Sequence, residues 1–293
     1  MLAPASVTAP AAERPPDVSL YAKALEKYVQ ADGKVHYAGL RDDIEDLDRF
    51  VGQIARVSPR SHPELFPGPE AGLAYWLNTY NALVLWAFAR EYPEKRNRLK
   101  GLIGRALFFY RKKFVVGGKK LSLAAIENGI IRKRFREPRI HFALVCASRS
   151  CPRLARKPYT AEHLEARLEE ETRRFLNEER NVRIDPAART VTLSKLFDWY
   201  AEDFGDSNTK RLAFVARYRP DGEALRKGKW RVRYFDYDWS PNDVQNPPPP
   251  GGAYSVSADP DDPSRCGPSA GPEPESRSRT ASPEHLRRRP AAR

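Results

Sequence analysis

The segment from Ala71 to Arg90 constrains the fold most, because apolar residues surround nearly the whole circumference of the helix it would form. A surface helix carries a single apolar stripe, whereas a helix that is apolar all round needs burial on every side. We therefore predict a central helix over these residues. Asn78 and Asn81 lie three residues apart and share a face of it. Their buried amides either satisfy loop backbone or line a polar site.

Shorter elements lie on both sides of this helix in the sequence. Apolar spacing predicts amphipathic helices near residues 21–28 and 42–56, a hairpin over residues 181–193 and a last strand near residues 230–234. The segment VVGGKK at 115–120 predicts a strand and tight turn, and KLFDWYAEDF at 195–204 predicts a helix between Ser194 and Gly205. We expect one α/β (α+β) domain, in which the buried central helix packs on a small mixed or antiparallel sheet.

The two ends of the chain differ in composition from the rest. Residues 1–17 are rich in alanine and proline, and residues 246–293 are rich in proline, serine and arginine. Such segments lack the apolar surface that offsets the entropy of ordering a chain, so we expect both to be disordered. The globular domain then spans residues 18–245.

Positive charge is concentrated in one segment of the chain. The 293 residues carry a formal charge of +13, and residues 90–120 hold eleven Lys or Arg against two acids, with aromatic residues between them. This mixture can meet anionic lipid or nucleic acid, or it can form a solvated basic surface. We take Arg111, Lys112 and Lys113 as candidate binding residues. Specific nucleic-acid binding is disfavoured because no known motif is present.

The sequence contains no run of about 18 apolar residues, so we predict no transmembrane segment. Its N-terminus lacks the basic start and apolar core of a secretory signal, which indicates a cytoplasmic protein as the sequence is written. Export is the alternative if the start site is misassigned, and Cys146 and Cys151 could then pair. Three cysteines are too few for a disulfide framework.

The stretch from Pro138 to Leu154 carries a histidine and two cysteines. Residues 140–147 are typical of a buried strand, whose alternation would place His141 and Cys146 on opposite faces. Cys151 follows this strand and is a candidate nucleophile if a nearby base activates it. A zinc site is disfavoured because the close C-x2-C spacing is absent. We predict no metal and no cofactor.

Glu127 lies on the apolar side of a helix that we predict to begin after the N-cap residue Ser122. A buried carboxylate needs a cation or a hydrogen-bond donor nearby, and we expect Arg139 or His141 to supply it. A structural salt bridge, a functional acid or base, and simple surface exposure of Glu127 all remain open.

Six segments, in this order, resemble the bacterial and plant family called domain of unknown function 547. They are YWLNTYNAL at 75–83, LSLAAIENGIIR at 121–132, PRIHFALVCASRSCPRL at 138–154, FLNEERNV at 175–182, LSKLFDWYAEDF at 193–204 and YDW at 237–239. The resemblance covers about residues 20–240 and implies a single α/β domain whose motif residues share importance. It implies no particular activity, cofactor or substrate.

Two functions are compatible with these residues. The first is a binding module with a polar site around His141 and Glu127 and a basic surface at residues 90–120, which meets an unknown small molecule or anionic partner. Asn78, Asn81 and Arg139 would belong to its binding site. The alternative is a hydrolase or transferase acting on an amide or thioester-like substrate, with His141 as base, Glu127 as its orienting residue and Cys151 as nucleophile. The oligomeric state does not follow from the sequence.

Overall fold

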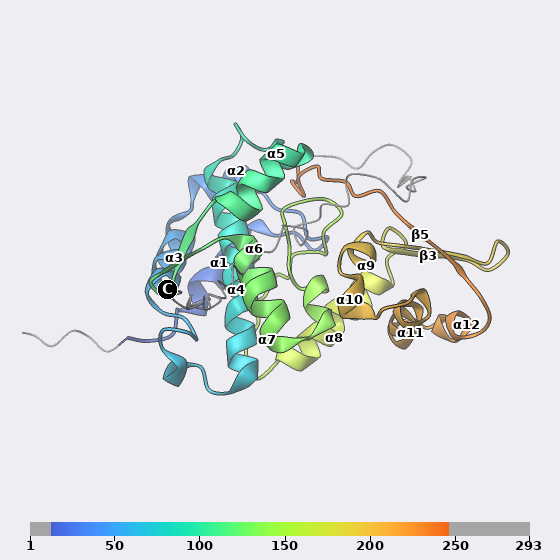
Figure 1. Ribbon diagram of the computed structural model, residues 1–293. Helices are drawn as coiled ribbons and strands as arrows, with labels where there is room; N and C mark the ends of the chain where they lie inside the picture. Colours follow the sequence, from blue (N-terminus) through green and yellow to red (C-terminus); the bar gives the residue numbers. More distant parts are fainter. Residues whose placement is uncertain (1–12, 246–293) are drawn as a thin grey trace, which may run out of the picture.

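The computed structural model describes residues 13–245 and combines many helices with two small sheets (Figure 1). In the first half of the chain the elements are α1 (Val18–Tyr28), α2 (Tyr37–Asp42), α3 (Glu45–Arg56), η1 (Pro63–Leu65), α4 (Gly68–Arg90), η2 (Arg98–Lys100), α5 (Leu102–Arg105), η3 (Ala106–Arg111), β1 (Phe114–Val116), β2 (Lys119–Leu121), α6 (Leu123–Ile126), η4 (Glu127–Arg132), α7 (Lys133–Phe135) and η5 (Pro138–Phe142). The second half contains α8 (Leu164–Leu176), β3 (Val182–Asp185), β4 (Thr190–Leu193), α9 (Leu196–Trp199), α10 (Ala201–Phe204), α11 (Asn208–Tyr218), α12 (Gly222–Arg226) and β5 (Arg231–Tyr234).

The mixed α/β fold class is confirmed. The disorder that we expect at residues 1–12 and 246–293 lies outside the described residues. Residues 13–17 are described, and Asp17 caps α1 by accepting a hydrogen bond from the backbone N–H of Ser19. No helix among residues 13–245 is long and apolar enough to cross a membrane.

Helix α4 is the central helix that the sequence predicts. Its side chains are buried around the whole circumference from Gly72 to Leu85. In Figure 1 it runs through the middle of the helical part of the molecule, and it packs against α2, α3, α6 and η4. An apolar surface on every side is thus covered mainly by other helices.

The buried apolar residues form two clusters. The larger surrounds α4, and the smaller contains the sheet β3–β4–β5, in which β4 pairs antiparallel with β3 and parallel with β5. Trp199 and Tyr237 pack against both clusters. Ile140 belongs to the first cluster and Phe142 to the second, so His141 lies where the two clusters meet.

The tight turn that we predict after Val116 is present as a two-residue hairpin. Gly117 and Gly118 have φ values of 53° and 74°, and Val116 pairs with Lys119 across the turn. Two consecutive positive φ angles match the twist of a hairpin and are readily adopted by glycine.

The strand that we expect over residues 140–147 is wrong. The chain instead forms the 3-10 helix η5, which Glu137 caps by accepting from the N–H of Arg139, and then continues without regular structure to Ala147. The backbone here pairs with a side chain rather than with a strand: Asn81 donates to the carbonyl of Ala143 and accepts from the N–H of Val145, each at 2.9 Å. The spacing of apolar residues in a sequence cannot indicate that a distant asparagine side chain will bind the backbone.

Candidate functional site

Glu127 is buried at the start of η4, beneath two phenols. The N-cap expected of Ser122 is present, since its hydroxyl accepts from the N–H of Ala125. The hydroxyl of Tyr200 donates to the carboxylate of Glu127. Burial, with the negative charge of Glu127 added to it, raises the pKa of Tyr80 and of Tyr200 well above the usual range. Both phenols therefore stay protonated at neutral pH and can donate to the carboxylate.

His141 is held by a carboxylate that itself binds an arginine. The Nε2 atom of His141 lies 2.6 Å from Oδ2 of Asp203 in α10, and Arg132 in η4 binds both oxygens of Asp203 at 2.6 and 3.1 Å. The imidazole also stacks on the ring of Tyr200, with centroids 3.9 Å apart. Three segments of the chain thus converge on one partly buried ion pair.

These contacts set the protonation of the pair. Burial lowers the pKa of His141. The hydrogen bond and negative charge of Asp203 raise the same pKa, but by less than burial lowers it. Burial alone would raise the pKa of Asp203, but hydrogen bonds from His141 and Arg132 lower it to about 2. A neutral His141 must donate through Nε2–H to reach the ionised Asp203, which leaves the Nδ1 lone pair as an acceptor.

Cys146 and Cys151 are joined by a disulfide, with their Cα atoms 6.2 Å apart. The hydroxyl of Tyr237 lies 3.3 Å and 3.2 Å from the two sulfur atoms, and Ser148 is 3.2 Å from each. The pairing that we left open is therefore present. As placed in this structure, Cys151 offers no free thiol to act as a nucleophile.

These groups surround one small cavity of about 20 Å³. Its lining comprises Tyr80, Glu127, His141, Leu144, Cys146, Cys151, Pro152, Leu196, Trp199, Tyr200, Tyr237 and Trp239. The expected separation of His141 from Cys146 is wrong, because the segment is not a strand and both residues line this space. A space of this size holds about one water molecule. We call these residues, together with Asp203, which binds His141, the polar centre; in this conformation its cavity has no room for a substrate.

The two central-helix asparagines satisfy loop backbone. Asn78 donates to the carbonyl of Tyr159 at 2.7 Å and accepts from the N–H of the same residue at 2.9 Å, as Asn81 does for Ala143 and Val145. This is the first of the two alternatives given for them. Arg139 lies apart from Glu127, since its guanidinium binds Glu137 and Glu165. We expected Arg139 or His141 to compensate the carboxylate of Glu127, but the hydrogen-bond donor is the hydroxyl of Tyr200.

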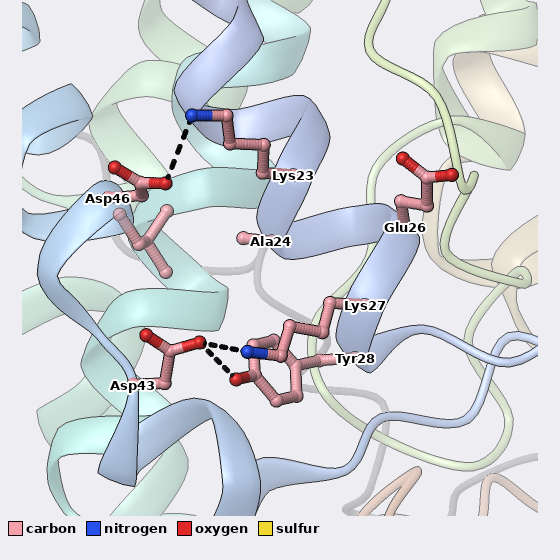
Figure 2. Close-up of a pocket in the computed structure, with 8 residues that line it drawn as sticks. Lys23, Ala24, Glu26, Lys27, Tyr28, Asp43 and Asp46 are labelled. Carbon is pink, nitrogen blue, oxygen red and sulfur yellow. Dashed lines mark hydrogen bonds and ion pairs between the residues drawn. The ribbon is translucent and has the colours of Figure 1, made fainter.

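Two of the larger hollows are lined by charged side chains. One of about 350 Å³ lies beside α1, where Lys27 pairs with Asp43 at 2.6 Å and Lys23 with Asp46 at 3.6 Å (Figure 2). Both of its lysines are thus paired, and Glu26 is a third acid in the lining. The other, of about 220 Å³, lies on the outer side of Cys151.

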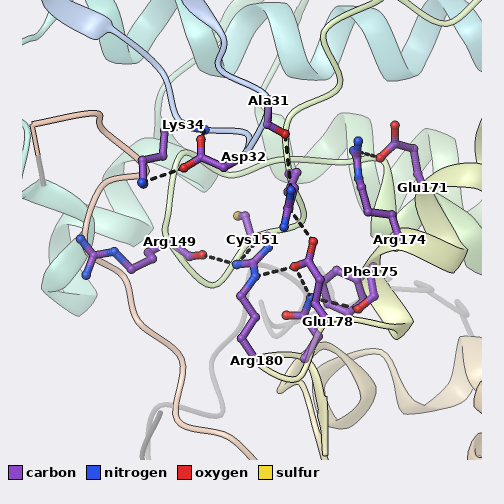
Figure 3. Close-up of polar contacts among 12 residues, drawn as sticks. Ala31, Asp32, Lys34, Arg149, Cys151, Glu171, Arg174, Phe175, Glu178 and Arg180 are labelled. Carbon is purple, nitrogen blue, oxygen red and sulfur yellow. Dashed lines mark hydrogen bonds and ion pairs between the residues drawn. The ribbon is translucent and has the colours of Figure 1, made fainter. Parts of the chain in front are cut away.

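Arginines around the outer hollow fix the cysteine loop. Arg180 donates to the carbonyl of Arg149 at 2.8 Å and pairs with Glu178, which Arg153 also binds at 2.5 Å (Figure 3). These cations are held by carboxylates and carbonyls of the same chain. The loop that carries the disulfide is therefore tied on its outer side as well as at the polar centre. Among residues 13–245 no group of three or more His, Cys, Asp or Glu side chains is arranged to hold a metal.

The basic segment divides into paired and exposed cations. Arg98 and Lys112 both pair with Glu91, and Arg90 pairs with Asp48. Arg111 and Lys113 are exposed. Of the three candidate binding residues in this segment, Lys112 is thus held internally, whereas its two neighbours face solvent.

Residues 67–176 match a family model described as a protein of unknown function, DUF547. Over these residues the chain is similar to the DUF547 family. The resemblance seen in the sequence is confirmed for this part of the chain. No curated protein and no solved structure matches the chain in the corresponding searches.

The DUF547 segment supplies only part of the polar centre. It contains Glu127, His141 and both cysteines, whereas Tyr200, Asp203 and Tyr237 follow it in the chain. We did not predict Asp203 or Tyr200 as site residues. The available signal was an acid inside the apolar segment LSKLFDWYAEDF. We read that segment as one helix, but it is broken at Tyr200 into α9 and α10.

Proposed function

We propose that this DUF547 protein is a binding module whose basic surface holds an anionic partner. The basic surface comprises the exposed cations of residues 90–120 other than Arg90, which pairs with Asp48; they are Lys95, Lys100, Arg111, Lys113, Lys119 and Lys120. No Asp or Glu occurs from residue 95 to residue 126. Within the described part of the chain these six side chains have no ion pair, unlike the arginines around the polar centre. Cations without internal partners are the observation that carries this proposal.

One observation favours a second function, a hydrolase or transferase dependent on His141. Asp203 orients the imidazole and leaves Nδ1 as an acceptor, which is how a general base is prepared. Two features argue against it: the disulfide occupies both thiols, and the cavity of about 20 Å³ admits no substrate. Binding is therefore the function that we propose.

Charge reversal at the basic surface tests this proposal. Replacing Lys100, Arg111 and Lys113 by glutamate should weaken binding of heparin, used as a polyanion probe, by at least about tenfold, because three attractive contacts become repulsive. The affinity of the full chain should also fall steeply between about 0.05 M and 0.3 M salt. Fluorescence titration with labelled heparin measures both effects.

A matched variant separates the basic surface from overall charge. Arg217, Lys229 and Arg233 are exposed and have no ion pair among the described residues. Replacing these three by glutamate changes the net charge by the same amount and should weaken heparin binding by less than about threefold. Equal losses in the two triple variants would show that only the net charge matters, and would refute a dedicated basic surface.

A further inference from the structure

The helical run formed by α5 and η3 buries a charged side chain and exposes aliphatic ones. Arg105 is buried and points inward, donating to the carbonyls of Leu99 and Lys100 at 3.0 and 3.1 Å, with its guanidinium 4.5 Å from the ring centre of Trp239. Phe108 and Phe109 are buried on the same inner side. The charged residue that would ordinarily face water therefore lies underneath the run.

Aliphatic side chains occupy the side that faces solvent. Leu102 is 51%, Ile103 is 78% and Leu107 is 50% exposed. In residues 13–245 only Val115 is another exposed large hydrophobic side chain. Ile103 and Leu107 are four residues apart, as are Leu102 and the exposed Ala106, so they project from one side of the helical run. We call these four residues the outward face.

Positive charge borders the outward face, and negative charge is absent from its sequence neighbourhood. Lys100 precedes it, while Arg111 and Lys113 follow it, and all three are exposed. The nearest acids in the sequence are Glu94 and Glu127. An exposed apolar patch with a cationic border is typical of an interaction site rather than of an ordinary solvated surface.

We infer that the outward face docks on an anionic lipid bilayer, with its aliphatic side chains in the headgroup region and the flanking cations against lipid phosphates and carboxylates. This inference rests on the proposed function and names its anionic partner. The helical run lies at the upper edge of the molecule in Figure 1. Its exposed large apolar residues are leucine and isoleucine, whose side chains can be buried at the boundary of headgroups and acyl chains.

Vesicle binding by the full chain tests this docking. The protein should co-sediment with phosphatidylcholine vesicles that contain about one third phosphatidylserine and should remain in solution with phosphatidylcholine alone. Replacing Leu102, Ile103 and Leu107 by serine should weaken vesicle binding by at least about tenfold, because the inserted aliphatic area is lost. These side chains are exposed, so the substitution leaves the core intact. Val115→Ser is the matched control and should bind within about twofold of the wild type.

The outcomes separate this inference from the proposed function. If the wild type binds heparin in a salt-dependent manner but not the anionic vesicles, the membrane assignment is overturned while the basic surface stands. Binding of poly-L-glutamate that the serine variant loses, with no vesicle binding, would instead indicate an acidic protein partner. A serine variant that binds vesicles as tightly as the wild type would remove the outward face from the contact. Failure of the wild type to bind heparin and vesicles alike would overturn both.

Discussion

Replacing Asp203 by alanine is expected to lower the free energy of unfolding by about 3 kcal/mol, because it leaves the partly buried Arg132 and the buried His141 without the carboxylate that binds both. The side chain of Arg132 is only 12% exposed, so water compensates poorly for the loss. Urea denaturation followed by circular dichroism measures this change.

Glu202 provides the control from the same helix. It also binds Arg132, but its side chain is 81% exposed. Glu202→Ala should therefore cost less than about 1 kcal/mol. Equal costs for the two substitutions would contradict the special role of the buried pair.

The contribution of Asp203 should also depend on pH. Its pKa is lowered from 3.8 to about 2, so its stabilisation is fully present above its ordinary pKa and is lost as the pH falls towards 2. The difference between wild type and Asp203→Ala should thus be smaller near about pH 3 than near about pH 7.

Asn81→Ala should lower the free energy of unfolding by about 3 kcal/mol, a second large effect. It leaves the carbonyl of Ala143 and the N–H of Val145 buried without partners, and each unpaired group costs about 1–3 kcal/mol. Asn97→Ala is the control, since Asn97 is exposed and its side chain does not cap η2; it should change stability by less than about 0.5 kcal/mol. A small loss for Asn81→Ala would indicate that water replaces the amide.

The elements that could be predicted from the sequence are those determined by residues close together in the chain. The apolar circumference of α4 required burial on all sides, and the Gly117–Gly118 pair specified a tight hairpin. Ser122 capped its helix as expected because an N-cap depends only on the next three residues.

The polar centre was harder to predict because its contacts join distant residues. His141 and Asp203 are 62 positions apart, and Glu127 and Tyr200 are 73 apart. Nothing in the sequence near His141 indicates which acid will reach it. The same holds for the loop after η5, where an asparagine side chain supplies the hydrogen bonds that a neighbouring strand would give.

The outward face escaped prediction for a different reason. Leucines and isoleucines in a helical run are ordinarily read as its buried side, and the arginine as its exposed side. Here Trp239, 134 positions beyond Arg105 in the chain, accepts the guanidinium over its ring and turns Ile103 and Leu107 outward.

A vesicle titration of two variants side by side tests most directly whether binding resides in the outward face rather than in the polar centre. Asp203→Asn removes the negative charge that binds His141 while keeping the size of the side chain, and the serine variant at Leu102, Ile103 and Leu107 removes the outward face. With both variants shown to be folded by circular dichroism, we predict that Asp203→Asn binds anionic vesicles within about twofold of the wild type and that the serine variant loses at least about tenfold. The reverse order, with binding lost in Asp203→Asn and kept in the serine variant, would contradict the proposed binding surface.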